Sequence, residues 1–220
     1  TTLLIIVLLF STYISYSADT TLLFKPLAAN VFEPRIGAVY EGNDEKLRLD
    51  IGYSLDLKEF NPSKSTKLRI GADFFTYTRL SSAGSFKFPV ETSDYFFGLN
   101  TTARSKVKNN EFSLRFRLAH ISSHLVDGMA EDTLFTREPF TYSREFIDLA
   151  SALQMGDLRY YTGFTYNFSL LPDDAESIFY YLGFDYRMEL SDYFDFVAGG
   201  DIKIFSMKPE SMKSIAAQAG

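Results

Sequence analysis

His120, Ser122 and His124 occupy every second position of one short stretch, and their types are those of nucleophilic catalysis. An imidazole can take the proton of a serine hydroxyl, and a carboxylate can orient the imidazole. A simple hairpin across residues 125–139 places residue 120 opposite residue 145, which brings Glu145 within reach of His120. The spacing therefore predicts an ester hydrolase with Ser122 as nucleophile, His120 as base and Glu145 as the orienting carboxylate.

The same residues share a strand face with apolar side chains. Side chains two positions apart point the same way along a β-strand. The face of Ser122 also carries Phe112, Leu114, Phe116 and Leu118. If that face meets lipid, the presence of polar side chains on it must be explained, because the burial of polar groups in hydrocarbon costs free energy. Catalysis is one reason, and the alternative is a position near the membrane interface, where lipid headgroups solvate them.

Two-residue alternation recurs along the chain and indicates the fold. Residues 46–58 and 178–190 each place apolar side chains on one face and mostly polar side chains on the other. Glycines recur on the polar face, at Gly37, Gly52, Gly71, Gly98, Gly163, Gly183 and Gly199. A solvent-exposed sheet would favour β-branched residues there, so these glycines indicate a narrow, filled interior. We predict an all-β fold, an antiparallel up-and-down transmembrane β-barrel with its apolar face toward lipid.

Nine strands are predicted, at residues 34–41, 46–58, 66–80, 92–104, 111–124, 140–152, 157–170, 178–190 and 193–205. Short connections mostly alternate with longer ones, as in outer-membrane barrels. Nine is an odd number for a bacterial barrel, so further strands are expected after Gly220. The expected divisions are a clipped signal peptide at 1–18, a periplasmic N-terminal segment at 19–33, the barrel at 34–205, and the start of a missing C-terminal part at 206–220.

The N-terminus and the composition predict a location. An apolar run from Leu3 to Phe10, followed by small and polar residues to Ala18, is typical of a secretory signal peptide. An exported membrane protein without an apolar helix must be a barrel, which indicates the bacterial outer membrane. The net charge of -6 without a basic block argues against nucleic acid, and the absence of cysteine excludes a disulfide framework. No cofactor or metal is expected.

A series of short motifs runs through the chain in a fixed order: FKPL at 24–27, GADFF at 71–75, DYFFG at 94–98, HISSH at 120–124 and REF at 144–146. In these motifs the chain resembles a family of exported bacterial proteins known only as a domain of unknown function and counted among outer-membrane β-barrels. The resemblance extends from Phe24 to Phe205. It implies a fold and a location but no activity.

A second, local resemblance concerns the polar cluster. His120 and Ser122, with Glu145 on the next predicted strand, resemble the lipid A deacylases, small outer-membrane barrels whose His-x-Ser motif faces the outer leaflet. The resemblance implies hydrolysis of acyl esters. Deacylases commonly carry asparagine after the serine, whereas Ser123 stands here, which leaves oxyanion stabilisation without an assigned donor.

Three functions are therefore compatible with the sequence. The first is a lipid-facing serine ester hydrolase acting on lipid A or phospholipid acyl chains. The second is a structural or assembly barrel without chemistry, and the third is a narrow channel. Membrane lipids or lipopolysaccharide are the expected partners, and the sequence leaves protein partners open.

Overall fold

The computed structural model describes residues 22–41, 45–85, 87–131, 134–135, 138, 141–172, 177–207 and 210–219. The expected signal peptide at 1–18 lies outside these residues. Ten strands form one antiparallel sheet: β1 (Ile36–Glu41), β2 (Lys46–Phe60), β3 (Thr66–Ser81), β4 (Val90–Val107), β5 (Asn110–Leu125), β8 (Tyr142–Met155), β9 (Leu158–Leu171), β10 (Ile178–Ser191), β11 (Phe194–Met207) and β12 (Glu210–Ala219). A 3-10 turn, η2 (Asp127–Met129), and a short hairpin, β6 (Ala130–Glu131) with β7 (Leu134–Phe135), lie between β5 and β8.

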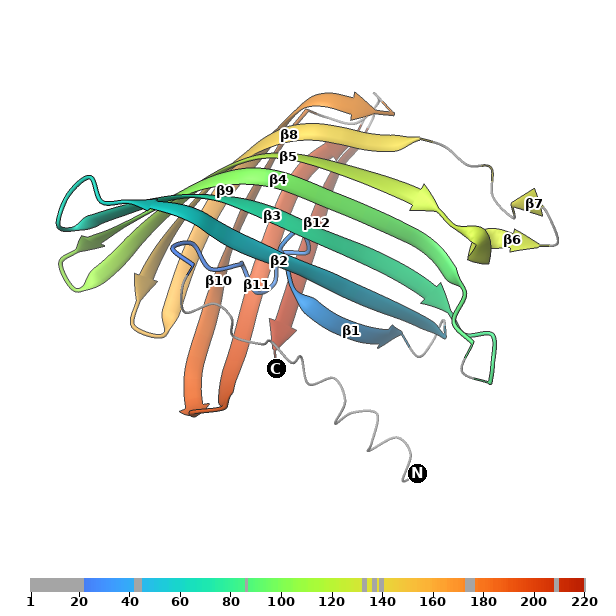
Figure 1. Cartoon of the computed structure of the whole chain (residues 1–220), viewed down its shortest axis with the longest axis horizontal. Helices are drawn as coiled ribbons and strands as arrows, with labels where there is room; N and C mark the ends of the chain where they lie inside the picture. The colour runs from blue at the N-terminus through green and yellow to red at the C-terminus, as the bar shows by residue number, and fades with distance from the viewer. Residues whose placement is uncertain are drawn as a thin grey trace.

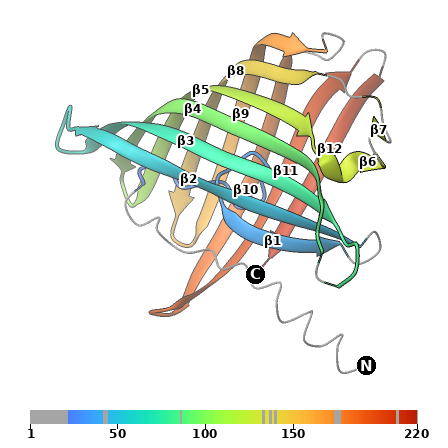
Figure 2. The ribbon, with the colours of Figure 1, turned by 45° about the vertical axis from the view of Figure 1, so that its right-hand side comes forward.

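The sheet curls into a half-barrel whose edges are β1 and β12 (Figures 1 and 2). The nine predicted strands correspond to β1 to β5 and β8 to β11, so the all-β antiparallel prediction is confirmed. The tenth strand, β12, pairs with β11 in the stretch at 206–220 where no strand was predicted. Among the described residues, no helix has the length and apolar character needed to cross a membrane.

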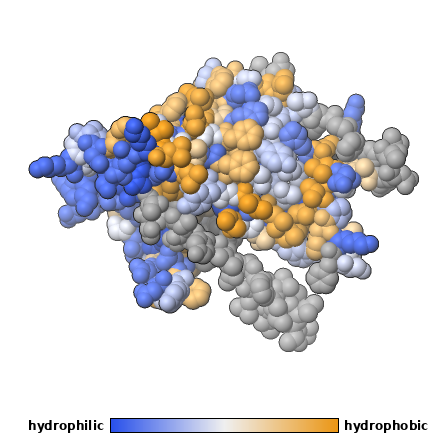
Figure 3. All heavy atoms as spheres, viewed as in Figure 1, coloured by the Kyte–Doolittle hydropathy of each residue, from blue (hydrophilic) through white to orange (hydrophobic). Residues whose placement is uncertain are grey.

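The two faces of the sheet differ in chemistry. On β10, Tyr180 and Leu182 are 59% and 51% exposed on the convex face, whereas Tyr181 and Asp185 are buried on the concave face. The same alternation runs along the longer strands, so the convex face is apolar and the concave face carries the buried charges. In Figure 3, apolar side chains gather across the middle of the visible face, and hydrophilic ones gather at the end that carries the short turns.

Close approach on the concave face explains two of the predicted interior glycines. Tyr181 pairs with Gly163 across β9 and β10, and Tyr161 pairs with Gly183 two residues away on the same ladder. A Cβ on either glycine would lie 2.4 Å from the facing tyrosine ring. The absence of a side chain lets each ring lie across the neighbouring strand, which fills the interior with aromatic groups.

Residues 22–35 run along the concave face inside the curve of the sheet (Figure 1), and we call them the inner segment. Phe24 and Leu27 pack in a buried cluster with Ala150, Ala152, Tyr161 and Tyr181. Phe32 packs against a second cluster, made of Phe75, Tyr77, Phe96, Ala119, Ile121 and Phe146. The inner segment therefore adds apolar side chains to both buried clusters that the strands form on the concave face.

Candidate functional site

The predicted catalytic residues lie on two neighbouring strands, on the convex face: His120 and Ser122 near the end of β5, and Glu145 near the start of β8. His120 pairs with Glu145 in the β5–β8 ladder, and His120 Nδ1 lies 2.9 Å from Glu145 Oε1. The Ser169 side chain on β9 also bonds to Glu145. The side chains of His120 and Glu145 are 31% and 37% exposed, so they form a partly exposed pair and not a buried ion pair.

Ser122 makes a different contact from the predicted one. Its hydroxyl lies 3.1 Å from Nε2 of His124, the histidine two residues further along β5. Among the described residues, no hydrogen bond joins Ser122 to His120. The structure thus places all the predicted residues together but divides them into two pairs, Ser122 with His124 and His120 with Glu145. Spacing alone could not choose between the two histidines, because each is two positions from the serine.

Aromatic side chains from β4 hold both imidazoles. The ring of Phe97 stacks on His120 with centroids 5.3 Å apart, and Tyr95 lies tilted against His124 at 5.5 Å. Both aromatic residues come from the strand that pairs with β5 on its other side. We call the group of His120, Ser122, His124 and Glu145 the outer-face cluster. Its arrangement offers a hydroxyl bonded to one imidazole, and a carboxylate that orients the other.

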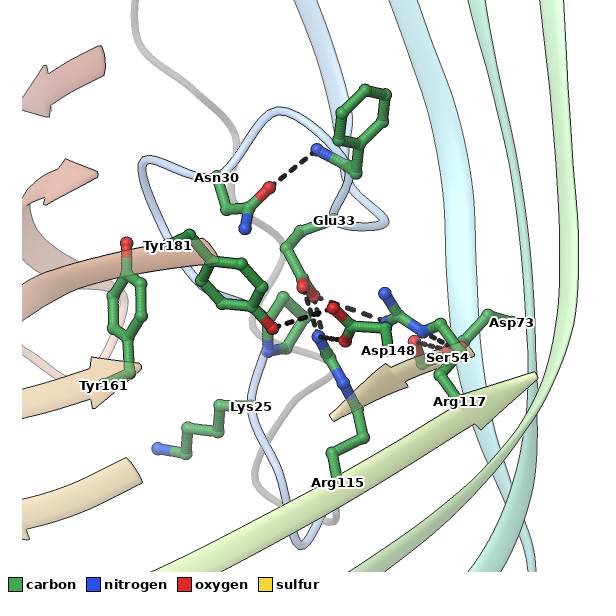
Figure 4. Close-up of polar contacts among 12 residues, drawn as sticks. Lys25, Asn30, Glu33, Ser54, Asp73, Arg115, Arg117, Asp148, Tyr161 and Tyr181 are labelled. Carbon is green, nitrogen blue, oxygen red and sulfur yellow. Dashed lines mark hydrogen bonds and ion pairs between the residues drawn. The ribbon is translucent and has the colours of Figure 1, made fainter. Parts of the chain in front are cut away.

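A second polar constellation occupies the concave face. Glu33 of the inner segment accepts two hydrogen bonds from Arg115 on β5, at 2.8 and 2.5 Å. Its Oε2 also lies 3.6 Å from Arg117 Nη2, and Arg117 bonds through Nε to Asp73 on β3 at 2.7 Å. Asp148 on β8 lies 3.5 Å from Arg115 (Figure 4). We call these five residues the inner network.

Hydroxyl groups complete the inner network. The Tyr181 and Thr165 hydroxyls donate to Asp148 at 2.9 and 3.0 Å, and the Ser54 hydroxyl donates to Asp73. Burial by itself would raise the pKa of Glu33, but the nearby Arg115 and Arg117 guanidiniums outweigh it and lower the pKa to about 2. Glu33 is therefore an anion at the centre of a buried, hydrogen-bonded set of charges.

The backbone of the inner segment is fixed by strand side chains. Arg159 donates to the carbonyl oxygens of Lys25 and Pro26 at 2.9 and 2.7 Å, and Arg104 donates to the carbonyls of Leu22 and Leu23. At the other end, Lys203 donates to Asn30 Oδ1 at 2.8 Å, and the Tyr77 hydroxyl donates to the carbonyl of Glu33. Strand side chains thus replace water for a segment that has no strand partner of its own.

The contacts of the inner segment were not predicted from the sequence. One feature of β5 does indicate that its arginine needs a partner outside the neighbouring strands. Arg115 points inward, yet the residues directly opposite are Thr102 on β4 and Ala150 on β8, neither of which is acidic. A buried arginine without a facing carboxylate needs an acid from elsewhere, and that acid is Glu33.

Comparisons with known proteins identify a family but no characterised relative. No curated protein and no solved structure matches the chain. A family model matches residues 90–220, which include the β4 and β5 strands and the complete outer-face cluster. By this match, the chain belongs to the family described as "Protein of unknown function (DUF1207)".

Proposed function

We propose that this protein is a β-barrel of the bacterial outer membrane with a structural role, anchoring or assembling other components of the envelope. The observation that carries the proposal is the inverted distribution of side chains on β5. Leu114, Phe116 and Leu118 are 39%, 43% and 46% exposed, whereas Arg115 and Arg117 between them are 4% and 2% exposed. An apolar exterior around a charged interior suits lipid as the surrounding solvent.

The filled interior favours this role over that of a channel. Conduction needs a continuous hydrated path. Here buried arginines pair with carboxylates, as in Arg115 with Glu33 and Arg159 with Asp185. The cavity beside Glu33 has a volume of about 20 Å³, which is room for about one water molecule. A larger groove of about 340 Å³ is lined by Leu22, residues 53–59 of β2 and Arg69, toward the short-turn end of the sheet.

The location is tested by fractionation of a diderm bacterium that expresses the full-length protein. We expect the protein in the outer-membrane fraction of a density gradient and expect it to stay there after a urea wash. In planar bilayers we expect no single-channel current. Recovery of native protein from the soluble fraction would contradict the membrane location, and a regular current would contradict the filled interior.

A matched pair of variants tests which face meets lipid. Phe116→Arg puts a charge in the middle of the convex face of β5, and in lipid vesicles it should lower the free energy of unfolding by about 2–4 kcal/mol. Phe112→Arg puts the same charge near the short-turn end, where the cost should be about 0–1 kcal/mol. Equal effects of the two variants would contradict a lipid-facing surface.

The outer-face cluster favours a second candidate, an ester hydrolase that acts on lipid A or phospholipid acyl chains. Support comes from the short Ser122–His124 and His120–Glu145 contacts on the apolar face, beside the long connection from β5 to β8. The Ser122 oxygen would attack the ester carbonyl carbon while an imidazole takes the hydroxyl proton and passes it to the departing alcohol. Water would then hydrolyse the acyl-serine and restore the hydroxyl, giving a fatty acid.

Mass spectrometry of lipid A and phospholipids from expressing cells tests this activity. Loss of an acyl chain should require Ser122, so Ser122→Ala should leave the lipids intact. Ser151→Ala is the matched control, because Ser151 also lies on the convex face, on β8. Comparison of His120→Gln with His124→Gln then identifies the base. Identical lipids with and without Ser122, at equal protein levels, would exclude the hydrolase on these substrates.

A further inference from the structure

Basic residues gather at the short turns of two hairpins, β2–β3 and β4–β5. The two turns lie side by side, because β3 pairs with β4 from Thr66 onward and the Lys106 amide donates to the carbonyl oxygen of Ser65 at 3.2 Å. Both turns lie at the left-hand end of Figure 1, where Figure 3 shows mainly hydrophilic residues. Residues 56–69 and 104–111 contain seven lysines and arginines but three acids, in a chain whose net charge is -6. Positive charge is therefore concentrated at one place in an acidic protein.

The arginines of this region pair with its acids, and the lysines do not. Arg69 pairs with Asp56 and Glu59, and Arg104 lies 3.7 Å from Glu111. The lysines form no ion pair with any residue that the structure describes, and each of them is exposed. They are Lys58, Lys64, Lys67, Lys106 and Lys108, and we call them the lysine patch. The patch therefore carries positive charge that no ion pair within the described part of the chain balances.

One member of the lysine patch faces another cation. Lys67 on β3 is directly opposite Arg104 on β4, so the two side chains lie on the same face of the sheet. Like charges directly opposite each other in a strand pair are destabilising. Glu111 on β5 pairs with Arg104 and forms no ion pair with Lys67. An anion bound at these turns would lower the repulsion between the two cations.

The other two short turns carry acids instead. Asp157 lies in the turn between β8 and β9, and Asp192 lies in the turn between β10 and β11. Glu189 and Asp195 flank the second of these turns, and Arg187 pairs with Asp195 at 3.3 Å. The lysine patch is therefore a feature of two neighbouring hairpins and not of the short turns in general, which favours a specific anionic ligand.

The lysine patch adjoins the apolar convex face. Val107 is 51% exposed between Lys106 and Lys108, and Leu57 is 64% exposed beside Lys58. In a membrane protein, exposed apolar side chains contact acyl chains, and lysines at the end of the apolar surface reach the headgroups. A soluble anion would use only the charges, whereas a lipid with an anionic headgroup would contact both kinds of side chain. The position of the lysine patch therefore favours a lipid.

We propose that the lysine patch binds phospholipids with an anionic headgroup, such as phosphatidylglycerol, in the membrane leaflet at the short-turn end. This inference rests on the membrane location proposed above. Phosphate oxygens accept hydrogen bonds from the lysine ammonium groups, and the acyl chains lie along the apolar side chains of β2 and β4. The phosphate charge also offsets the repulsion between Lys67 and Arg104. Zwitterionic phospholipids supply the same acyl chains but no net charge, so the lysine patch prefers anionic lipid.

Native mass spectrometry of the full-length protein, released from nanodiscs of equal parts phosphatidylglycerol and phosphatidylcholine, tests the proposal. The wild-type protein should retain phosphatidylglycerol in preference. Lys64→Gln combined with Lys108→Gln should lower this preference about tenfold, because each lysine adds to the attraction. Lys46→Gln combined with Lys87→Gln is the matched control, since it removes the same charge at the opposite end of the strands and should keep the preference. Equal retention of the two lipids by the wild-type protein, or equal loss of preference in the two double variants, would overturn the proposal.

Insertion into a bilayer is measured separately, by flotation with vesicles of phosphatidylcholine alone. The wild-type protein and both double variants should float equally. Failure of the wild-type protein to float would contradict the membrane location and the lipid site together, whereas flotation with equal retention of both lipids would contradict the lipid site alone. In the nanodiscs, capture of a soluble poly-glutamate peptide without a preference for phosphatidylglycerol would overturn the proposal and assign the lysine patch to an acidic protein segment.

Discussion

The outer-face cluster and the inner network each pair a glutamate with a nitrogen base, but the first pair is partly exposed and the second is buried. His120 and Glu145 are direct neighbours in one strand ladder, with side chains 31% and 37% exposed. Glu33 and Arg115 are 82 residues apart in the sequence, with side chains 2% and 4% exposed. An exposed pair adds little to stability, whereas a buried charge that loses its partner is strongly destabilising. We therefore expect the inner network to stabilise the fold, and the outer-face cluster to contribute little to stability.

The largest effect expected from this contrast is that of Glu33→Ala. The change leaves Arg115 buried without its main carboxylate, and it should lower the free energy of unfolding by about 3–5 kcal/mol. Denaturant unfolding in lipid vesicles or detergent measures it. Glu59→Ala is the control, because it removes an exposed partner of Arg69 and should leave the midpoint nearly unchanged. Similar midpoints for the two variants would show that burial does not separate the two kinds of ion pair.

Acid should weaken the inner network through the same residue. The pKa of Glu33 is lowered from 4.5 to about 2 in the folded protein, against the effect of burial, by the neighbouring arginines. Because the folded-state pKa is the lower one, the stabilisation is complete above about pH 5 and is lost as the pH falls toward 2. The loss amounts to about 3 kcal/mol. Unfolding midpoints across this pH range should converge for the wild-type protein and Glu33→Gln, and a constant difference would contradict the assignment.

A smaller loss of stability is expected from Gly163→Ala, which adds a methyl group where aromatic rings fill the interior. In Gly163→Ala the new methyl group would lie 2.4 Å from the Tyr181 ring and 2.6 Å from the carbonyl oxygen of Leu149. The displacement should cost about 1–3 kcal/mol of unfolding free energy. Ser151→Ala, on the convex face, should stay within about 0.5 kcal/mol of the wild-type value. If both substitutions are equally mild, the interior is less tightly packed than these distances indicate.

The nine predicted strands could be found because each has a local signal in the sequence. Alternation on β5 gave both its extent and its apolar face, and the hairpin geometry gave the pairing of residue 120 with residue 145. β12 lacks that signal, since its sequence ESMKSIAAQA has few strand-forming residues. It forms a strand through its pairing with β11, which is a tertiary effect that intrinsic preference does not capture.

The site was predictable only where its contacts follow from strand register. Glu145 was found because it lies across from His120. Glu33 was not found, because the inner segment lacks the alternation of apolar and polar residues that identifies a strand. Its contacts depend on how the whole sheet curls around it. The choice of His124 over His120 as the partner of Ser122 is set by side-chain orientation, which places the Ser122 hydroxyl beside His124 Nε2. Neither the contacts of Glu33 nor the pairing of Ser122 with His124 can be predicted from the spacing of residues in the sequence.

The smallest change in stability is expected in the outer-face cluster, and it is the one that discriminates best between the proposed roles. Glu145→Gln should lower the free energy of unfolding by less than about 1 kcal/mol, because the pair with His120 is half exposed. Glu111→Gln is the matched control, since Glu111 forms a comparably exposed pair with Arg104 at the other end of β5. Both variants should fold like the wild-type protein.

The two variants differ in what they should do to ester turnover. If His120 is the catalytic base, loss of its orienting carboxylate in Glu145→Gln should reduce hydrolysis of lipid acyl esters by about 10²–10⁴-fold, while Glu111→Gln leaves it unchanged. If His124 is the base, Glu145→Gln should have little effect and His124→Gln should abolish turnover. A Glu145→Gln variant that instead unfolds as readily as Glu33→Ala would break the contrast, because the outer-face cluster would then hold the fold in the way that the inner network does.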